Sequence, residues 1–237
     1  MEKLTLKEMK ENESFQGLLL IRESVQIFEE IYGKEAWMIA EQAELEFTLK
    51  MLKSPFLERK IKAMNEFKEF IDRADPSIEV RKLGDKKPFK YITQEKLKNW
   101  LIQQQVIEYI LGDETHVELL KRSSTFFNFL CQTNGLSNEY LNLLWKSSDG
   151  KYEDYVRAVY DNIVELSGLM SIEALEFMFS RIASIPMEEY TEMTISLIKE
   201  YSLKAMNSVE KAQSGSCNSI EMLIKAYNIY RFQNEKN

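Results

Sequence analysis

Residues 137–182, SNEYLNLLWKSSDGKYEDYVRAVYDNIVELSGLMSIEALEFMFSRI, read as three amphipathic helices separated by two short breaks. In the middle helix, apolar residues recur at i, i+3, i+4, i+7, i+8, i+11 and i+14, which places them on one side of a helix. They are Tyr152, Tyr155, Val156, Val159, Tyr160, Ile163 and Leu166. This side is expected to be buried. Gly168 is expected to take a positive φ just past the last turn, and Ser171 to cap the next helix.

The helices on either side of this middle helix repeat the pattern. Their apolar positions are Leu141, Leu144 and Trp145 before it, and Ile172, Leu175, Met178, Phe179 and Ile182 after it. Because three short helices cannot each bury a face alone, we expect them to stack against one another.

The rest of the chain also favours an all-α fold. The 237 residues are 44% hydrophobic, contain only 8 glycines and 4 prolines, and show no alternation of strands and helices. Further helices are expected at about 5–32, 34–53, 55–72, 93–111 (long or broken), 115–135, 186–213 and 220–232. Successive helix pairs of roughly 35 to 50 residues are typical of an α-solenoid of armadillo or HEAT repeats.

Residues 75–92, DPSIEVRKLGDKKPFKYI, interrupt the helical pattern. They hold two prolines and no apolar period, so we expect an exposed linker loop between an N-terminal helical block, 1–74, and a C-terminal helical-repeat block, 93–237. The loop carries five basic residues, Arg81, Lys82, Lys86, Lys87 and Lys90. This cluster could contact acidic partners or RNA, but Asp85 in its midst favours a solvated loop.

Charge and hydropathy exclude several classes of function. The formal net charge of −7 and the pI near 5.1 disfavour a nucleic-acid surface. No apolar run approaches the roughly 20 residues that span a bilayer, and the N-terminus lacks the apolar core of a signal peptide. We therefore expect an intracellular, cytoplasmic protein without a membrane partner, in which Cys131 and Cys217 are free thiols.

No motif for catalysis or ligand binding is visible in the sequence. A cysteine protease needs a thiolate and an oriented histidine, yet His116 is the one histidine and lies in a polar context at the start of an expected helix. One histidine and two isolated cysteines cannot form a zinc shell, and no glycine-rich phosphate loop occurs. We expect no catalytic, cofactor-binding or metal-ligating residues and no small-molecule partner. Phe177 lies off its helix's apolar stripe, so it lines either the core or a groove between repeats.

Several short motifs resemble the helical-repeat region of the very large ubiquitin-specific proteases of the fat-facets type. They are Leu144-Trp145-Lys146, Gly150-Lys151-Tyr152-Glu153, Val156-Arg157-Ala158-Val159-Tyr160-Asp161, Ser171-Ile172-Glu173-Ala174-Leu175-Glu176, and, upstream, Thr93-Gln94-Glu95-Lys96-Leu97-Lys98-Asn99-Trp100-Leu101, Val106-Ile107 and Ile110-Leu111. The resemblance covers about 50–207 and is strongest over 93–183. In that family the armadillo-like repeats lie outside the catalytic domain. Cys131 also does not lie in the family's Gly-Asn-Thr-Cys type of box.

Two functions from different classes remain open. The resemblance implies a non-catalytic scaffold segment of a large ubiquitin carboxyl-terminal hydrolase, a cysteine-type deubiquitinase, which positions the catalytic domain or binds ubiquitinated substrates and partner proteins. Composition alone also fits a stand-alone helical-repeat adaptor unrelated to ubiquitin. An all-α enzyme would need a convergent set of titratable groups, which the sequence does not indicate.

Overall fold

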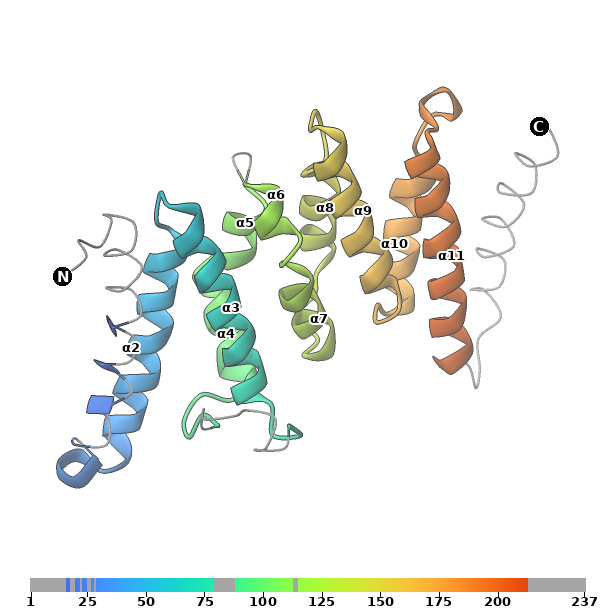
Figure 1. The fold of residues 1–237 in the computed structure, drawn as a ribbon. Coiled ribbons are helices and arrows are strands. Elements are labelled where there is room, and N and C mark those ends of the chain that lie inside the picture. Colours follow the sequence, from blue (N-terminus) through green and yellow to red (C-terminus); the bar gives the residue numbers. More distant parts are fainter. Residues whose placement is uncertain are drawn as a thin grey trace. The chain divides into compact units, whose positions relative to one another are not determined.

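The computed structural model describes residues 16, 17, 20, 21, 23, 24, 27, 29–78, 88–112 and 115–212. Over these residues the chain forms ten α-helices and no strand, which confirms the all-α, armadillo-like solenoid class (Figure 1). Within this described part, none of the helices combines the length and the apolar character needed to cross a membrane. The chain divides into two compact units, Met1–Gln104 and Gln105–Asn237, which are described separately below.

The first unit contains α2 (Lys34–Leu52), α3 (Leu57–Ala74) and α4 (Gln94–Gln103). α2 begins after Gly33, whose φ of 56° is readily adopted by glycine, and packs antiparallel to α3 across the short Ser54-Pro55 turn. Apolar side chains are buried on two sides of α2, as is typical of a helix packed between neighbours. These side chains are Ala36, Ala40, Leu45, Leu49, Met51 and Leu52.

The end of the predicted linker is docked on the first unit. The buried carboxylate of Glu41 accepts hydrogen bonds from the backbone N–H groups of Lys90, Tyr91 and Ile92 at 2.6, 2.9 and 2.9 Å. The N–H of Phe89 donates to the carbonyl of Arg73 at 3.1 Å. The other four basic residues of the loop lie outside the described residues, and the division into 1–74, 75–92 and 93–237 stays a prediction.

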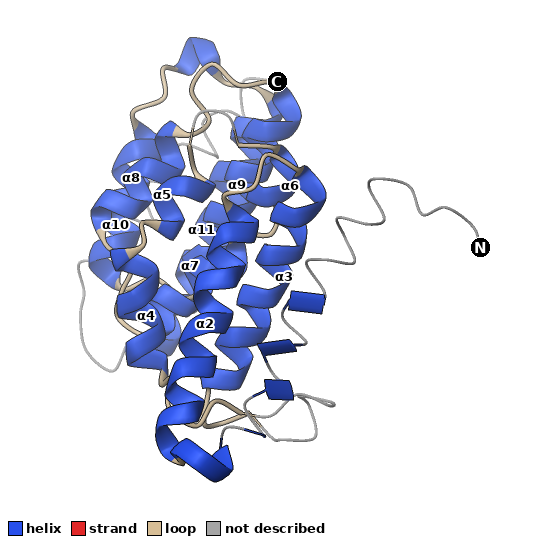
Figure 2. Ribbon diagram, turned by 90° about the vertical axis from the view of Figure 1, so that its left-hand side faces the viewer, coloured by secondary structure: helices blue, strands red, loops and turns tan. Residues whose placement is uncertain are grey.

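The second unit is a double layer of short helices. It contains α5 (Val106–Ile110), α6 (Val117–Leu120), α7 (Ser124–Gln132), α8 (Asn138–Lys146), α9 (Glu153–Ser167), α10 (Ile172–Ala183), the 3₁₀ turn η2 (Met187–Glu189) and α11 (Glu192–Ala212). α8 and α10 form one layer, and α9 and α11 form the other (Figures 1 and 2). The buried Tyr201 of α11 joins the layers, because its hydroxyl donates to the carbonyl of Leu175 in α10 at 2.7 Å.

Helix ends differ from the sequence expectation at several points. Ser171 caps α10 as predicted, accepting from the N–H of Ala174, and Thr93 caps α4 in the same way. The expectation for Gly168 is wrong: its φ is −72°, because the chain leaves α9 through a right-handed turn in which Leu169 donates to the carbonyl of Leu166. The expected helix from 93 is broken at Gln105, whose φ is 54°.

Two more expected helices begin or divide differently. The helix expected at 115–135 is divided into α6 and α7, and Pro186 precedes η2 rather than α11. The helix expected at 220–232 lies outside the described residues. These differences leave the order of helical segments as the sequence predicts it, but they shift where each segment begins.

The apolar stripe of α9 is only partly buried. Tyr155, Val159, Ile163 and Leu166 are fully buried, whereas Tyr152 is 57% exposed because it is the N-cap residue rather than a helical one. Tyr160 is half-buried and stacks on Trp145 of α8, with ring centroids 6.1 Å apart. The apolar spacing of α9 therefore does not show that one edge of Tyr160 is at the surface.

Candidate binding groove between α9 and α11

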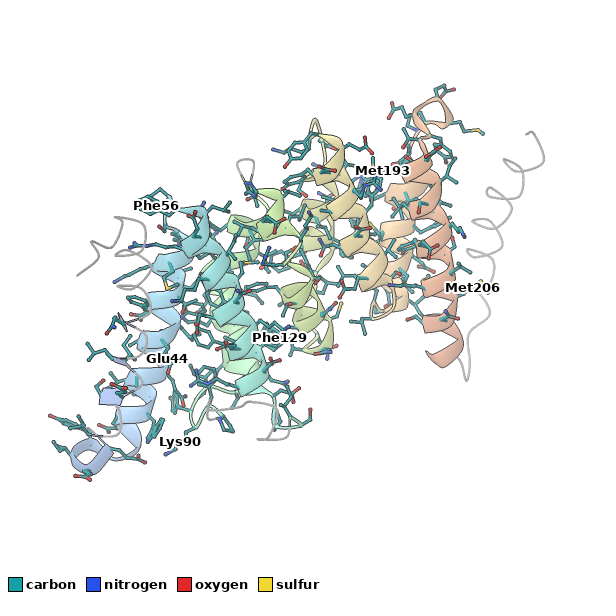
Figure 3. All side chains as sticks on the ribbon, in the orientation of Figure 1. Glu44, Phe56, Lys90, Phe129, Met193 and Met206 are labelled. Atoms are coloured by element: carbon teal, nitrogen blue, oxygen red, sulfur yellow. The ribbon has the colours of Figure 1, made fainter. Side chains whose placement is uncertain are left out.

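A groove of about 830 Å³ lies between α9 and α11 in the second unit. Its lining residues, which define the α9–α11 groove, are Glu153, Arg157, Tyr160, Asp161, Val164, Thr191, Glu192, Met193, Ser196, Leu197 and Glu200. Met193, labelled in Figure 3, lies at the start of α11 on the side that faces α9. The volume is in the range of sites that hold small molecules or several side chains of a partner.

α9 and α11 run parallel, so their corresponding turns face each other along the groove. The Tyr160 side chain lies beside Thr194 near the beginning of α11, and Ser208 Oγ donates to the carbonyl of Gly168 at 2.7 Å further along both helices. α11 begins at Glu192, about 40 residues after α9 begins at Glu153, which is the period of armadillo and HEAT repeats. The groove thus separates equivalent helices of two successive repeats.

The floor of the groove is apolar. Tyr160 and Val164 of α9 and Met193 of α11 are half-buried there, and Leu197 is almost fully buried. The ring of Tyr160 is stacked on one side against Trp145. An apolar floor that is already ordered can receive a partner side chain without a large loss of conformational entropy.

The rim of the groove is acidic. Glu153 and Asp161 on α9 and Glu192 and Glu200 on α11 are its carboxylates, against one lining base, Arg157. Arg157 is held by Glu153, with Nη2 at 2.8 Å from Oε1. The rim therefore has three carboxylates in excess of its base, counted as four acids and one base.

The hydroxyl of Tyr160 also lies in a negative environment. Burial is the main cause that raises its pKa, the hydrogen bond with Thr194 opposes the rise, and the charges of Asp149 and Glu189 add to it. Two carboxylates beyond the groove lining thus extend the acidic character around its floor.

Neither His116 nor Cys131 lines this groove. His116 is exposed at the N-cap of α6, where its Nδ1 accepts from the N–H of Glu118 at 3.2 Å. Cys131 is a free thiol near the end of α7, and Cys217 lies outside the described residues. In the described ranges, no three His, Cys, Asp or Glu side chains gather to hold a metal ion.

Burial raises the pKa of the Cys131 thiol to about 11, which is opposite to the shift that activates a nucleophilic cysteine. At pH 8 this leaves about 100-fold less thiolate than an ordinary cysteine has, so we expect alkylation of Cys131 by iodoacetamide to be slowed by a similar factor. Mass spectrometry of the Cys131 peptide measures the rate. The control is the chain in denaturant, and equal rates in the two conditions would contradict the burial.

The groove is not visible in the sequence because its residues appear as ordinary parts of two separate helices. Glu153 and Arg157 form an exposed i,i+4 pair, and Tyr160 lies in an apolar stripe. Phe177 is expected either in the core or in a groove between repeats. It is half-buried on α10, with its ring centroid 5.1 Å from the Arg181 guanidinium carbon, and it does not line the α9–α11 groove. The sequence feature that could have indicated the groove is the equal spacing of its acidic lining residues, because each helix carries two of them eight positions apart.

Comparisons with known proteins confirm the resemblance. The family described as UBP24/USP9X/USP9Y ARM repeat matches residues 39–213. Relatives include ubiquitin carboxyl-terminal hydrolase puf of Drosophila melanogaster, 24% identical over 43% of this chain, and ubiquitin carboxyl-terminal hydrolase 9X of Mus musculus, 24% identical over 57% of it. Ubiquitin carboxyl-terminal hydrolase 34 of Homo sapiens is 25% identical over 44% of this chain.

The matched segments span only 2%, 5% and 3% of the lengths of these three relatives, respectively. The family match, by contrast, covers most of this chain and includes α3 to α11 completely. The chain therefore belongs to the UBP24/USP9X/USP9Y armadillo-repeat family.

Proposed function

We propose that this chain is a non-catalytic helical-repeat segment of a large ubiquitin carboxyl-terminal hydrolase, which positions the catalytic domain or binds substrate and partner proteins. The observation that carries the proposal is the family match over residues 39–213, a region of armadillo repeats. The relatives that share part of this chain are all ubiquitin carboxyl-terminal hydrolases by name.

The chemistry of the described residues supports a non-catalytic role. The buried Cys131 thiol has a raised pKa, and the His116 ring is engaged in capping α6. Neither residue therefore has the environment of a thiolate–histidine pair, because the thiol pKa is raised rather than lowered and the His116 Nδ1 accepts a backbone hydrogen bond instead of contacting an orienting group.

A binding role is supported by the α9–α11 groove. It combines an apolar floor with a charged rim, the arrangement by which protein surfaces gain both affinity and orientation for a partner. Stacked repeats expose such grooves repeatedly along their surface, and this property suits them to hold proteins. A cytoplasmic location is part of the same proposal, because ubiquitin chemistry on protein substrates takes place inside the cell.

Two measurements test this function. Purified 1–237 is expected to release no fluorophore from a ubiquitin C-terminal fluorogenic amide, and turnover that disappears in Cys131→Ala or Cys217→Ala would overturn the non-catalytic assignment.

Sequencing of the genomic reading frame around this stretch is expected to find a cysteine box and a later histidine box. An intact frame that encodes the helical repeats alone would instead favour a stand-alone adaptor.

A further inference from the structure

We propose that the α9–α11 groove binds a basic protein segment in extended conformation, with two Lys or Arg residues four positions apart and an apolar residue midway between them. This inference rests on the proposed function, because it names the class of partner that the same groove takes. Charge complementarity with the acidic rim, together with the spacing of the carboxylates, selects this occupant.

The carboxylates lie at two levels along the groove. Glu153 and Glu192 lie toward the N-terminal ends of the parallel helices, and Asp161 and Glu200 each follow eight residues later. Eight helical residues rise about 12 Å, so each rim offers negative charge at two levels separated by about that distance.

An extended peptide matches this separation. At about 3.3 Å per residue, four residues span about 13 Å, and the side chains at i, i+2 and i+4 point to the same side. Basic side chains at i and i+4 therefore reach the two acidic levels, while the side chain at i+2 faces the floor made by Tyr160, Val164 and Leu197.

Other occupants fit the groove less well. The excess of three carboxylates over the lining base disfavours phosphate groups and acidic peptides. The carboxylates are spread over two helices and two levels, and the described residues contain no cluster of three ligands for a metal ion. A purely apolar segment would bring no positive charge to the three carboxylates that exceed the lining base.

A fluorescein-labelled synthetic peptide, Lys-Ser-Leu-Ser-Lys flanked by glycine and serine, is the probe. Fluorescence anisotropy with the full 1–237 chain at low ionic strength is expected to show saturable binding that weakens as salt is raised, because exposed ion pairs are screened. Two matched peptides serve as controls, one with Glu for both Lys residues and one with Ser for Leu, and both are expected to bind at least about tenfold more weakly.

Matched variants of the protein locate the binding site. Asp161→Lys with Glu200→Lys reverses one carboxylate on each rim, and we expect the Kd to rise about tenfold. Glu165→Lys with Glu176→Lys makes the same change in net charge at exposed positions of α9 and α10 that do not line the groove, and the Kd is expected to change less than about twofold. Circular dichroism compares the helix content of both variants.

If the reversed variant loses its helices, Glu192→Gln with Glu200→Gln replaces it, and we expect a rise in Kd of about threefold. Equal weakening by the groove variant and the control variant would overturn the proposal, because binding would then reflect net charge alone. Absence of binding, or equal binding of the leucine-free peptide, would overturn it as well. The outcomes of the hydrolysis and reading-frame tests do not depend on peptide binding. Failure of this inference and failure of the proposed function are therefore distinguishable.

Discussion

Arg73→Ala is expected to lower the free energy of unfolding of the first unit by about 3–5 kcal/mol, because it removes one partner of a buried ion pair. Arg73 Nη1 lies 2.6 Å from Glu44 Oε2, and the two side chains are 7% and 4% exposed. The guanidinium of Arg73 also lies 3.9 Å from the ring centroid of Phe89. The substitution therefore leaves the Glu44 carboxylate buried without this cation and removes the contact of the guanidinium with the Phe89 ring.

Urea denaturation followed by tryptophan fluorescence measures the effect, since Trp37 and Trp100 both lie in the first unit. The control is Arg157→Ala in the second unit, where Trp145 reports unfolding; it breaks the exposed pair with Glu153 and is expected to cost less than about 1 kcal/mol. Similar midpoint shifts for the two variants would show that the pair of Arg73 and Glu44 does not have the energetics of a buried ion pair.

Local periodicity predicts the helices of the first unit but not the polar contacts that join them. α2 and α3 lie where the apolar spacing and the Ser54-Pro55 break indicate. Glu41 and Glu44, however, look like ordinary surface acids of α2, and their partners lie 29 to 51 residues further along the chain. Residues 88–92 have no apolar period, so their docking through backbone N–H groups on Glu41 could not be predicted from the pattern.

The candidate groove could not be predicted from the sequence for a related reason. The paired acids of α9 and α11 are visible in the sequence. They form a common rim only because α9 and α11 pack side by side, although α10 lies between them in the chain. Hydrophobic spacing shows which side of each helix is buried, and it does not show which helix covers it. The family resemblance predicts stacked repeats, yet it does not identify a binding residue.

Tyr155→Ala is expected to destabilise the second unit by about 3–5 kcal/mol, whereas Tyr160→Ala is expected to cost about 1–2 kcal/mol. The apolar stripe of α9 treats these residues as equivalent, but Tyr155 is 1% exposed and Tyr160 is half-buried at the groove. Truncation of Tyr155 leaves a cavity that the surrounding helices can fill only in part. Truncation of Tyr160 removes the stacking on Trp145, and water can enter the space because the site opens to the groove.

The two variants are matched in residue type, substitution and helix, so the difference between them reports the different surroundings of the two rings. Urea denaturation followed by circular dichroism gives both free energies of unfolding. Because Tyr160 forms part of the groove floor, Tyr160→Ala is also expected to weaken binding of the basic peptide to the folded protein. Tyr155 does not line the groove, so it makes no direct contact with the peptide there. Equal losses of stability would mean that Tyr160 belongs to the core, and the groove would then lack the exposed aromatic floor on which its binding role depends.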